Sequence, residues 1–237
     1  MKFDYLWENG PVMAQEESFR LGTDSVLLGN FVNIQGVRRG IDLGCAVGTL
    51  TLLLLCRSES LQMTGVELDA AAADIARANM ERNGLQDRAS IITGDLRDFR
   101  ALGSSGSFDL VIANPPYFPL SAGVVSPNDR RALARGEVGC TIDDLCAAAK
   151  YLCRWDGKVC FVYKPERIVE LFSAMRKYGI EPKRLRVVAH TADAVPSLIL
   201  VEGRRGGKAG LKMEPMLLLK NPDGSDTDEI KKIYHRS

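Results

Sequence analysis

The feature that most constrains the fold is an alternation of short apolar runs with longer amphipathic stretches, which begins near Arg39. Short apolar runs are typical of buried strands, and amphipathic stretches are typical of helices. Strands and helices that alternate in this way predict βαβ units and a parallel sheet covered on both faces. The expected strands are 40–43, 63–67, 89–93, 108–113 and 158–163. Helices are expected at 49–57, 142–155 and 166–178. A further helix is expected to begin after its cap, Asp69, and to end at Asn83-Gly84.

The last part of the chain breaks this alternation. Further strands are expected at 184–189, 197–201 and 216–219, with no helix between them. The interval 190–196 is too short for a parallel crossover, so the first two of these strands should pair antiparallel. The predicted fold is therefore α/β, with a doubly wound, mostly parallel sheet that ends in an antiparallel hairpin.

The composition narrows the class of protein. A chain of 237 residues with 46% hydrophobic and 26% charged residues is typical of globular proteins, and its longest apolar run, 50–56, is far too short to span a membrane. The first residues lack the apolar stretch of a secretory signal, so we expect a cytoplasmic protein. The six cysteines include no CxxC pair, which argues against disulfides and a metal site.

We expect one domain, residues 1–237. Within it, 1–35 form an N-terminal cap, 36–220 the core, and 221–237 a C-terminal tail.

A turn of small residues follows the first expected strand, in the segment Asp42-Leu43-Gly44-Cys45-Ala46-Val47-Gly48. Small residues let a ligand approach the backbone, and the N-terminus of the next helix offers unpaired N–H groups. Ala46 stands where the commoner D-x-G-x-G-x-G pattern has glycine, and its methyl group fits there if φ is negative. On its own, such a turn is explained as well by tight packing as by a ligand site.

Acidic residues end the next two expected strands. Glu67 lies 19 residues after Gly48, and at about this spacing a carboxylate binds the hydroxyls of a ribose. Asp95 follows the third strand and is placed to accept from an adenine amino group, or alternatively to cap a helix from Leu96 onward. Together with the turn of small residues, these positions predict an adenosine-containing cofactor.

The most specific motif is Asn114-Pro115-Pro116-Tyr117, directly after the fourth expected strand. An exocyclic amine on a base is a poor nucleophile because its lone pair is delocalised into the ring. Two acceptors aimed at its hydrogens favour the geometry in which the lone pair is available. The Asn114 side-chain carbonyl and the Pro115 backbone carbonyl are candidates for these acceptors, and Tyr117 offers a ring on which a base stacks. Taken alone, the motif also fits a double-proline loop that ends a strand.

These motifs resemble those of class I S-adenosylmethionine-dependent methyltransferases that act on planar amino groups. Nearly the whole chain also resembles the bacterial tRNA(Val) adenine-N6 methyltransferase family, through Gln15 and the segments 19–28, 135–137, 164–167, 182–186 and 200–205. The resemblance implies a Rossmann-like fold and S-adenosyl-L-methionine as cofactor. It also implies N6-methylation of the unpaired adenine just 3′ of a tRNA anticodon, by direct SN2 transfer from the sulfonium.

The resemblance also implies roles for individual residues. Gly44, Ala46 and Gly48 would lie against the methionine part of the cofactor, Glu67 on its ribose and Asp95 on its adenine. Thr23 and Asp24 would cap a short helix over the amino-acid end of the cofactor. The full cofactor-binding set is Thr23, Asp24, Asp42, Gly44, Ala46, Gly48, Glu67, Asp95 and Asn114. The catalytic set is Asn114, Pro115 and Tyr117.

Other functions remain open at this point. Related methyltransferases use the same Asn-Pro-Pro-Tyr motif to methylate guanine N2 in rRNA or glutamine N5 in proteins. A nicotinamide-dependent oxidoreductase would share Glu67 but leave 114–117 unexplained. A module that only binds RNA or a partner predicts no methyl transfer. The sequence predicts no oligomeric state.

The net charge of +1 conceals an uneven distribution. Residues 1–120 carry 10 basic and 15 acidic side chains, whereas 121–237 carry 21 basic and 15 acidic ones. RNA binding needs cationic surface. Cations on or beside the closing hairpin are the hypothesis for that surface, namely Lys183, Arg184, Arg186, Arg204, Arg205 and Lys208, with Lys212 next to them. The alternative is an ordinary solvated set of charged turns.

Overall fold

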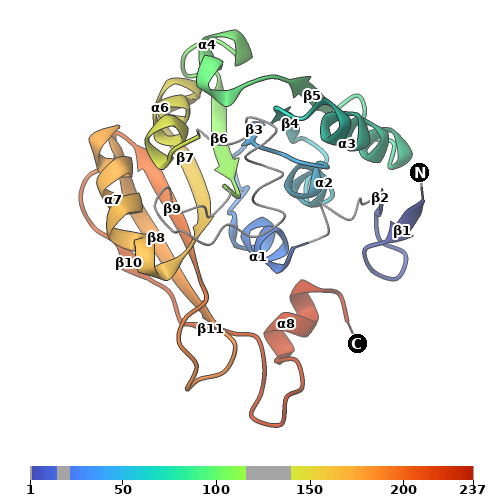
Figure 1. Cartoon of the computed structure of the whole chain (residues 1–237), viewed down its shortest axis with the longest axis vertical. Helices are drawn as coiled ribbons and strands as arrows, with labels where there is room; N and C mark the ends of the chain where they lie inside the picture. Colours follow the sequence, from blue (N-terminus) through green and yellow to red (C-terminus); the bar gives the residue numbers. More distant parts are fainter. Residues whose placement is uncertain (1, 15–21, 116–139, 237) are drawn as a thin grey trace, which may run out of the picture.

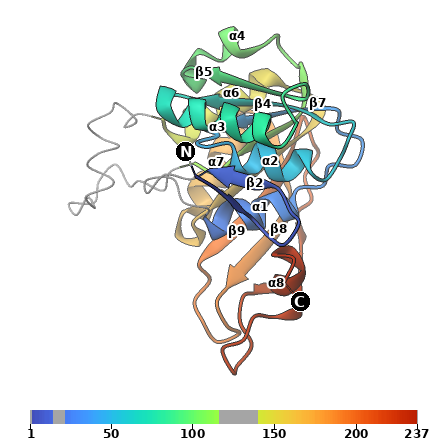
Figure 2. The ribbon, with the colours of Figure 1, turned by 90° about the vertical axis from the view of Figure 1, so that its right-hand side faces the viewer.

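The computed structural model describes residues 2–14, 22–115 and 140–236. They form three layers, in which a central sheet lies between two groups of helices (Figure 1 and Figure 2). None of the helices in the described ranges is long and apolar enough to cross a membrane. All six cysteines lie within these ranges, and each is a free thiol.

The central sheet has nine strands. They are β3 (Arg39–Leu43), β4 (Gln62–Glu67), β5 (Ala89–Thr93), β6 (Phe108–Ala113), β7 (Cys153–Tyr163), β8 (Ile180–Ala189), β9 (Leu198–Arg205), β10 (Lys212–Met213) and β11 (Leu217–Leu218). Their spatial order is β10-β8-β9-β7-β6-β3-β4-β5, and β11 also pairs with β8. Strands β5, β4, β3, β6 and β7 pair in parallel, whereas β9 is antiparallel to both β7 and β8. The predicted fold class is confirmed.

The helices cover both faces of this sheet. They are α1 (Thr23–Phe31), α2 (Thr49–Leu55), α3 (Ala70–Arg82), α4 (Phe99–Leu102), α6 (Ile142–Leu152), α7 (Ile168–Lys177) and α8 (Asp228–Ile233), with 3-10 helices η1 (Leu96–Asp98) and η2 (Pro165–Arg167). Buried side chains of α1, α2, α3 and α8 form the core on one face, and those of α4, α6 and α7 form the core on the other. The start of α3 is as predicted, because the Asp69 carboxylate accepts from the amides of Ala71 and Ala72.

The boundary between α6 and β7 differs from the prediction. The helix was expected to continue through Trp155, but it ends at Leu152 and the chain is extended from Cys153. Cys153 pairs with Phe108 of β6, and the Arg154 guanidinium donates to the Asp109 carboxylate at 2.6 Å. Contacts with a neighbouring strand therefore end the helix three residues early.

The closing strands confirm the antiparallel hairpin and add shorter pieces. β8 and β9 pair from Ile180 with Arg205 to Val188 with Leu198. The strand expected at 216–219 is reduced to β11, which pairs in parallel with β8. β10, which no sequence signal indicated, also pairs in parallel with β8.

Both ends of the chain contain structure beyond the predicted alternation. β1 (Phe3–Tyr5) and β2 (Val12–Ala14) form an antiparallel hairpin, and α1 packs against α2. In the expected tail 221–237, α8 buries Ile230 and Ile233 in the same core as α1. The rings of Trp7 and His235 stack with centroids 4.2 Å apart, so the N-terminal hairpin contacts the C-terminal segment.

The sheet has two functionally distinct edges. The carboxyl edge is where the parallel strands β3 to β7 end, and the amino edge is where they begin. Ligands of open α/β sheets bind at the carboxyl edge. Because β9 is antiparallel to β7, Arg204 pairs with Lys158 and therefore lies toward the amino edge.

Candidate functional site

The turn of small residues lies at the carboxyl edge, between β3 and α2. The amides of Gly44 and Cys45 both donate to the Val66 carbonyl of β4, each at 2.9 Å. Gly44 and Gly48 have φ values of 80° and 84°, in the left-handed region that glycine adopts without strain. The turn therefore reverses the chain within a few residues and directs it into α2.

The two glycines have different roles. A Cβ built on Gly44 would contact no described atom within 4 Å, so this side of the turn faces open space. A Cβ on Gly48 would lie 3.1 Å from Met80 Cε and 3.2 Å from Ala76 Cβ, both on α3. Gly44 thus leaves room for a ligand, whereas Gly48 allows α2 and α3 to approach.

Ala46 does not meet the condition of a negative φ that was stated for its methyl group. Its φ is +48°, not negative, so a non-glycine residue holds the left-handed conformation. That conformation costs an L-residue roughly 1 kcal/mol or more. The Ala46 amide donates to Glu67 Oε2 at 2.8 Å, and this contact holds the strained turn in place.

Glu67 ties the turn to the end of β4. Its Oε2 accepts from the Ala46 amide, and its Oε1 accepts from the Asp69 amide at 2.9 Å. Each carboxylate oxygen accepts more than one hydrogen bond. The half-buried Glu67 therefore combines a structural role with the capacity to accept from ribose hydroxyls.

Asp42 is a fully buried carboxyl group below this turn, with an exposed fraction of 0%. Its Oδ2 accepts from the Thr51 hydroxyl at 3.0 Å, whereas its Oδ1 has no partner in the described residues. Burial raises the pKa of Asp42 to about 7, with a smaller contribution from the nearby Glu67 charge, even though hydrogen bonds from Thr51 lower it. An orphaned acceptor on a buried carboxyl group is costly, and a cationic ligand group would relieve that cost.

Asp95 follows β5 and caps η1. Its side chain accepts from the Arg97 amide at 2.8 Å and from the Arg97 guanidinium. The side-chain hydrogen bond to Arg97 lowers the pKa of Asp95, so the group is a carboxylate. The capping alternative from the sequence is thus present, and the adenine-binding role stays a prediction.

Asn114 is the first residue after β6. Its side-chain amide nitrogen donates to the Ser25 hydroxyl of α1 at 3.0 Å. This contact orients the Asn114 amide. Pro115 is half-buried beside it, and the third predicted catalytic residue, Tyr117, lies outside the described residues.

The first turn of α1 lies at the same edge. The prediction that Thr23 and Asp24 cap this helix is wrong: the N-cap is Gly22, which has no side chain to make a capping hydrogen bond. Thr23 and Asp24 occupy the first turn of the helix instead. Their predicted cofactor contacts stay a prediction.

A cavity of about 210 Å³ connects some of these residues, but its lining does not include Thr23, Asp24, Glu67 or Asp95. Its lining comes from α1, the end of β3, the turn with the start of α2, and the end of β6, and consists of Gly22, Ser25, Asp42, Gly44, Cys45, Ala46, Val47, Thr49, Leu50 and Asn114. The structure therefore brings Asp42, the turn of small residues and Asn114 together. The sequence interpretation missed Ser25 and Thr51, although Thr51 lies nine residues after Asp42 at the start of a helix.

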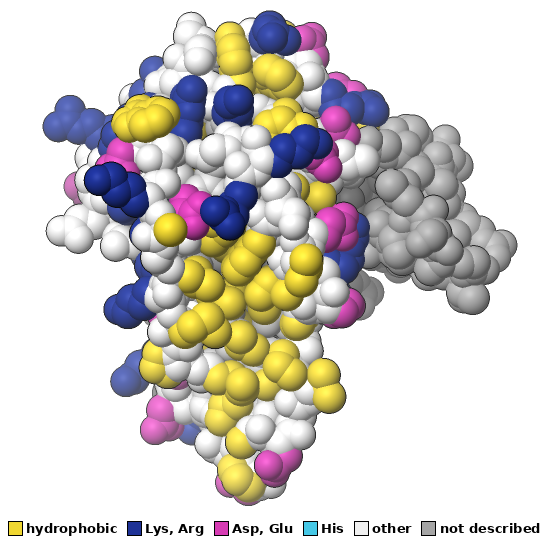
Figure 3. Space-filling view, turned by 90° about the vertical axis from the view of Figure 1, so that its left-hand side faces the viewer, with side chains coloured by type: hydrophobic (Ala, Val, Ile, Leu, Met, Phe, Trp, Pro, Cys, Tyr) yellow, Lys and Arg dark blue, Asp and Glu magenta, His cyan; other side chains and the backbone are white. Residues whose placement is uncertain are grey.

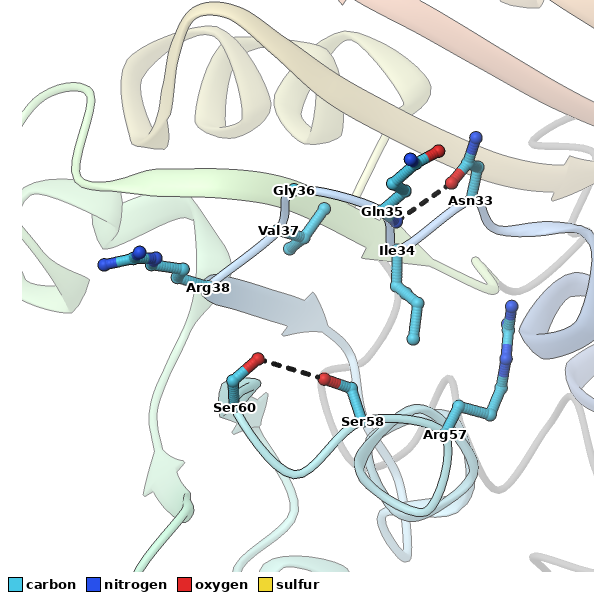
Figure 4. A pocket seen from close by; sticks show the side chains of 9 residues that line it. All are labelled: Asn33, Ile34, Gln35, Gly36, Val37, Arg38, Arg57, Ser58 and Ser60. Atoms are coloured by element: carbon cyan, nitrogen blue, oxygen red, sulfur yellow. Dashed lines mark hydrogen bonds between the residues drawn. The ribbon is translucent and has the colours of Figure 1, made fainter.

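A larger cavity, of about 490 Å³, lies at the opposite, amino edge. Figure 4 shows it between the turn before β3 and the turn after α2, with Arg38 and Arg57 among its lining residues. The Asn33 side chain accepts from the Gln35 amide, and the hydroxyls of Ser58 and Ser60 are 3.3 Å apart. Its polar side chains largely bond to one another or to nearby backbone.

The structure spreads the predicted RNA-binding cations along the closing hairpin, and Arg186 pairs with Leu200 near the carboxyl edge. Arg204 and Arg205 lie toward the amino edge, where β8 begins and β9 ends. Three cations of the set are held by carboxylates, Arg184 by Glu202 and Glu214, Arg186 by Glu229, and Arg204 by Asp156. On the face shown in Figure 3, Lys and Arg side chains are interspersed with Asp and Glu, and hydrophobic side chains gather over the lower half.

The remaining cations of the set have partners of another kind. Lys183 donates to the Lys208 carbonyl and Arg205 to the Cys153 carbonyl. In the described ranges, Lys183, Arg205 and Lys208 form no ion pair with a carboxylate.

Known proteins identify the family. The family model described as methyltransferase small domain matches residues 6–124, about half of the chain. The chain belongs to the methyltransferase small domain family. The match includes the turn of small residues, Glu67, Asp95 and Asn114, so the family assignment and the cavity concern the same part of the molecule.

Similar curated proteins share one name, tRNA1(Val) (adenine(37)-N6)-methyltransferase. This chain is 31% identical to the protein of that name from Photorhabdus laumondii. The alignment spans 219 residues, 91% of this chain and 87% of that protein. This chain is also 35% identical to the one from Dickeya chrysanthemi over 194 residues, covering 81% and 75%. The protein from Porphyromonas gingivalis is 30% identical over 193 residues, covering 79% and 75%.

Solved structures share the fold. A predicted O-methyltransferase from Agrobacterium tumefaciens aligns with a TM-score of 0.72 at 17% identity, over 90% of this chain and 96% of that one. TYW2 of P. horikoshii in complex with MeSAdo aligns with a TM-score of 0.58 at 14% identity, over 85% and 70%.

S-adenosylmethionine is the cofactor of this methyltransferase, and the cavity residues fit it. The orphaned Asp42 Oδ1 suits an ammonium group, and the open side of Gly44 would leave room for the amino-acid part of the cofactor. Glu67 carries acceptors suited to ribose hydroxyls. When bound, S-adenosylmethionine supplies a methyl group on a positively charged sulfur.

Proposed function

We propose that this methyltransferase methylates N6 of an adenine in tRNA, at the position next to the anticodon. The observation that carries the proposal is the position of Asn114, which lines the cavity at the carboxyl edge and whose side-chain amide donates to the Ser25 hydroxyl. The names of the curated relatives, which cover up to 91% of this chain, support the substrate assignment.

The residues that act on the adenine would be those after β6. The Asn114 side-chain carbonyl and the Pro115 backbone carbonyl would accept from the two hydrogens of the N6 amine, which favours an available nitrogen lone pair. Ser25 would keep the Asn114 amide in one orientation, so the acceptor is set before the base arrives. Tyr117 is proposed to stack on the base.

The catalytic contribution of these groups is positioning. The amine loses its proton only after it has gained the methyl group, so no strong base is needed at the start. The Asn114 and Pro115 carbonyls would stabilise the positive charge that develops on the nitrogen. An anticodon-loop adenine is already unpaired, so its entry costs less than extraction from a duplex.

We propose a smaller RNA-contacting set than the sequence indicated. Lys183, Arg205 and Lys208 lack carboxylate partners in the described part of the chain, so no ion pair has to be broken before they bind a phosphate. They lie toward the amino edge and would contact the tRNA backbone away from the target base. A tRNA substrate also implies that the protein works in the cytoplasm.

The test is incubation with labelled S-adenosylmethionine and unmodified total tRNA, followed by nucleoside mass spectrometry. The proposal predicts N6-methyladenosine in a valine tRNA. Appearance of 2-methylguanosine in rRNA, or of methylated glutamine in added protein, without N6-methyladenosine would overturn the substrate assignment.

A further inference from the structure

Two asparagines of α3 hold strand β2 by its backbone. Asn83 Oδ1 accepts from the Val12 amide at 2.9 Å, and Asn83 Nδ2 donates to the Val12 carbonyl at 2.7 Å. Asn79 makes the same pair of contacts to Ala14, at 2.7 Å and 3.2 Å. Each side-chain amide thus replaces one residue of a partner strand.

The spacing of the two elements explains this match. Four residues of an α-helix rise about 6 Å, and two residues of a strand rise about 6.7 Å. Asparagines four apart on α3 therefore align with alternate residues of β2. Because strand residues alternate in direction, Met13 between them points the other way and is fully buried in the core.

Asn79 differs from Asn83 in one additional contact. Its Nδ2 also donates to the Val47 carbonyl at 2.8 Å, within the turn that lines the cofactor cavity. The side chain is completely buried, so water does not replace any of its three hydrogen bonds. Asn83 instead donates to the Asn79 carbonyl of its own helix, and its side chain makes no hydrogen bond to the described residues of the turn.

The turn is thus held from two sides. Glu67 accepts from the Ala46 amide, and Asn79 donates to the carbonyl of the next residue, Val47. Both neighbours of Val47, Ala46 and Gly48, have positive φ. Opposed hydrogen bonds on adjacent residues fix the peptide planes of a strained turn against relaxation.

We infer that Asn79 is a positioning residue for the cofactor, which sets the turn at Val47 and links it to the docking of the N-terminal hairpin. Ala14, which Asn79 binds, lies eight residues before Gly22, which lines the cavity. One amide group therefore bonds both to the N-terminal segment and to the cofactor turn. The inference concerns cofactor binding and does not depend on which base is methylated.

The test compares Asn79→Leu with its matched control Asn83→Leu. Both variants remove the contacts to β2, but only Asn79→Leu removes the contact to Val47. S-adenosylhomocysteine affinity is measured by calorimetry, at a temperature where circular dichroism shows both proteins folded. We expect the Kd to rise about tenfold or more for Asn79→Leu and to stay within about threefold of the parent for Asn83→Leu.

A second readout does not require ligand. Hydrogen exchange of the cofactor-free protein should accelerate at 44–48 in Asn79→Leu and stay at the parent rate there in Asn83→Leu. If Asn79→Leu does not fold, Asn79→Ala replaces it with Asn83→Ala as its control, because this pair of variants also differs in the contact to Val47. Equal losses of affinity in the Asn79 and Asn83 variants, or no loss in either, would overturn the inference.

Discussion

The two edges of the sheet differ in how completely the oxygens of a buried or half-buried aspartate are hydrogen-bonded. At the amino edge, Asp109 accepts from the amides of Arg38 and Arg39 and from the Arg154 guanidinium. At the carboxyl edge, Asp42 has only the contacts from Thr51, and its Oδ1 has no partner in the described residues. The larger cavity lies at the amino edge, and the smaller one holds the orphaned acceptor and the strained turn. We therefore expect the ligand where a buried polar atom lacks a hydrogen-bond partner, and not where the cavity is largest.

The largest difference between the edges is expected from asparagine substitutions. Asn114→Ala should lower kcat by about 100- to 1,000-fold, because it removes an acceptor aimed at the reacting amine. Asn33→Ala at the amino edge breaks only a local contact to the Gln35 amide and should change kcat less than about twofold. Single-turnover methylation of tRNA measures both. Equal activity of Asn114→Ala and parent would exclude the proposed mechanism.

Opposite pH responses are expected from the two aspartates. The pKa of Asp42 is raised from 3.8 to about 7, so the folded state binds the proton more tightly than the unfolded state. Its contribution to stability is therefore full below pH 4 and is lost as the pH rises to 7. In cofactor-free protein, Asp42→Asn should raise the free energy of unfolding at pH 8 by up to a few kcal/mol, while it weakens S-adenosylhomocysteine binding.

The contribution of Asp109 to stability has the opposite dependence on pH. Burial acts to raise its pKa, but the hydrogen bonds from Arg38, Arg39 and Arg154 outweigh burial and hold the pKa below its ordinary value. Its contribution is present above pH 4 and is lost as the pH falls through the lowered pKa. Asp109→Asn should therefore lower stability at pH 8 and leave cofactor affinity unchanged. Urea unfolding of the Asp42→Asn and Asp109→Asn variants at pH 4 and pH 8 measures both changes in stability. A change of the same sign at pH 8 in both variants would contradict the predicted difference between the two aspartates.

A moderate effect is expected from the proposed RNA contacts. Replacing Lys183, Arg205 and Lys208 together by alanine should raise the KM for tRNA severalfold and weaken its dependence on salt, because fewer counterions are released on binding. The KM for S-adenosylmethionine should not change, since these residues lie far from the carboxyl edge. Arg186→Ala, which breaks the ion pair with Glu229, is the control and should leave the KM for tRNA unchanged. If the KM for tRNA changed in Arg186→Ala and not in the triple variant, the proposed set of RNA contacts would be wrong.

The smallest effect is expected from backbone strain. Ala46→Gly should stabilise the protein by at most about 1 kcal/mol, because relief of the left-handed strain is partly offset by the greater freedom of unfolded glycine. Asp156 at the amino edge also has a positive φ, of 57°, but aspartate tolerates it better. Asp156→Gly should thus stabilise less than Ala46→Gly in thermal unfolding. A loss of more than about 1 kcal/mol in Ala46→Gly would show that the Ala46 methyl group has a role in packing.

The parallel half of the fold was predictable because local signals agree there. Apolar runs mark β3 to β6, and β5 and β6 have the predicted bounds. The Asp69 cap and the Asn83-Gly84 stop are likewise local. The carboxyl-edge residues Asp42, Gly44 and Asn114 were predictable as a group, since successive parallel strands bring their ends together.

The remaining features depend on contacts between distant residues. β2 is held by Asn79, 65 positions away, and Asn114 is oriented by Ser25, 89 positions away, so no local pattern indicates either contact. The ion pairs that neutralise Arg184 and Arg186 use Glu214 and Glu229, which lie in later segments. The sign of φ at Ala46 follows from the bonds at Val66 and Glu67, and residue type alone predicts the opposite.

The central claim is that the cofactor occupies the smaller cavity at the carboxyl edge. Titration of 15N-labelled protein with S-adenosylhomocysteine, followed by backbone amide NMR, tests it directly. The largest shift changes are predicted at Gly44, Cys45, Ala46 and Asn114, with 33–38 and 57–60 unchanged. Largest changes at 33–38 and 57–60, around the larger cavity of the amino edge, would contradict it.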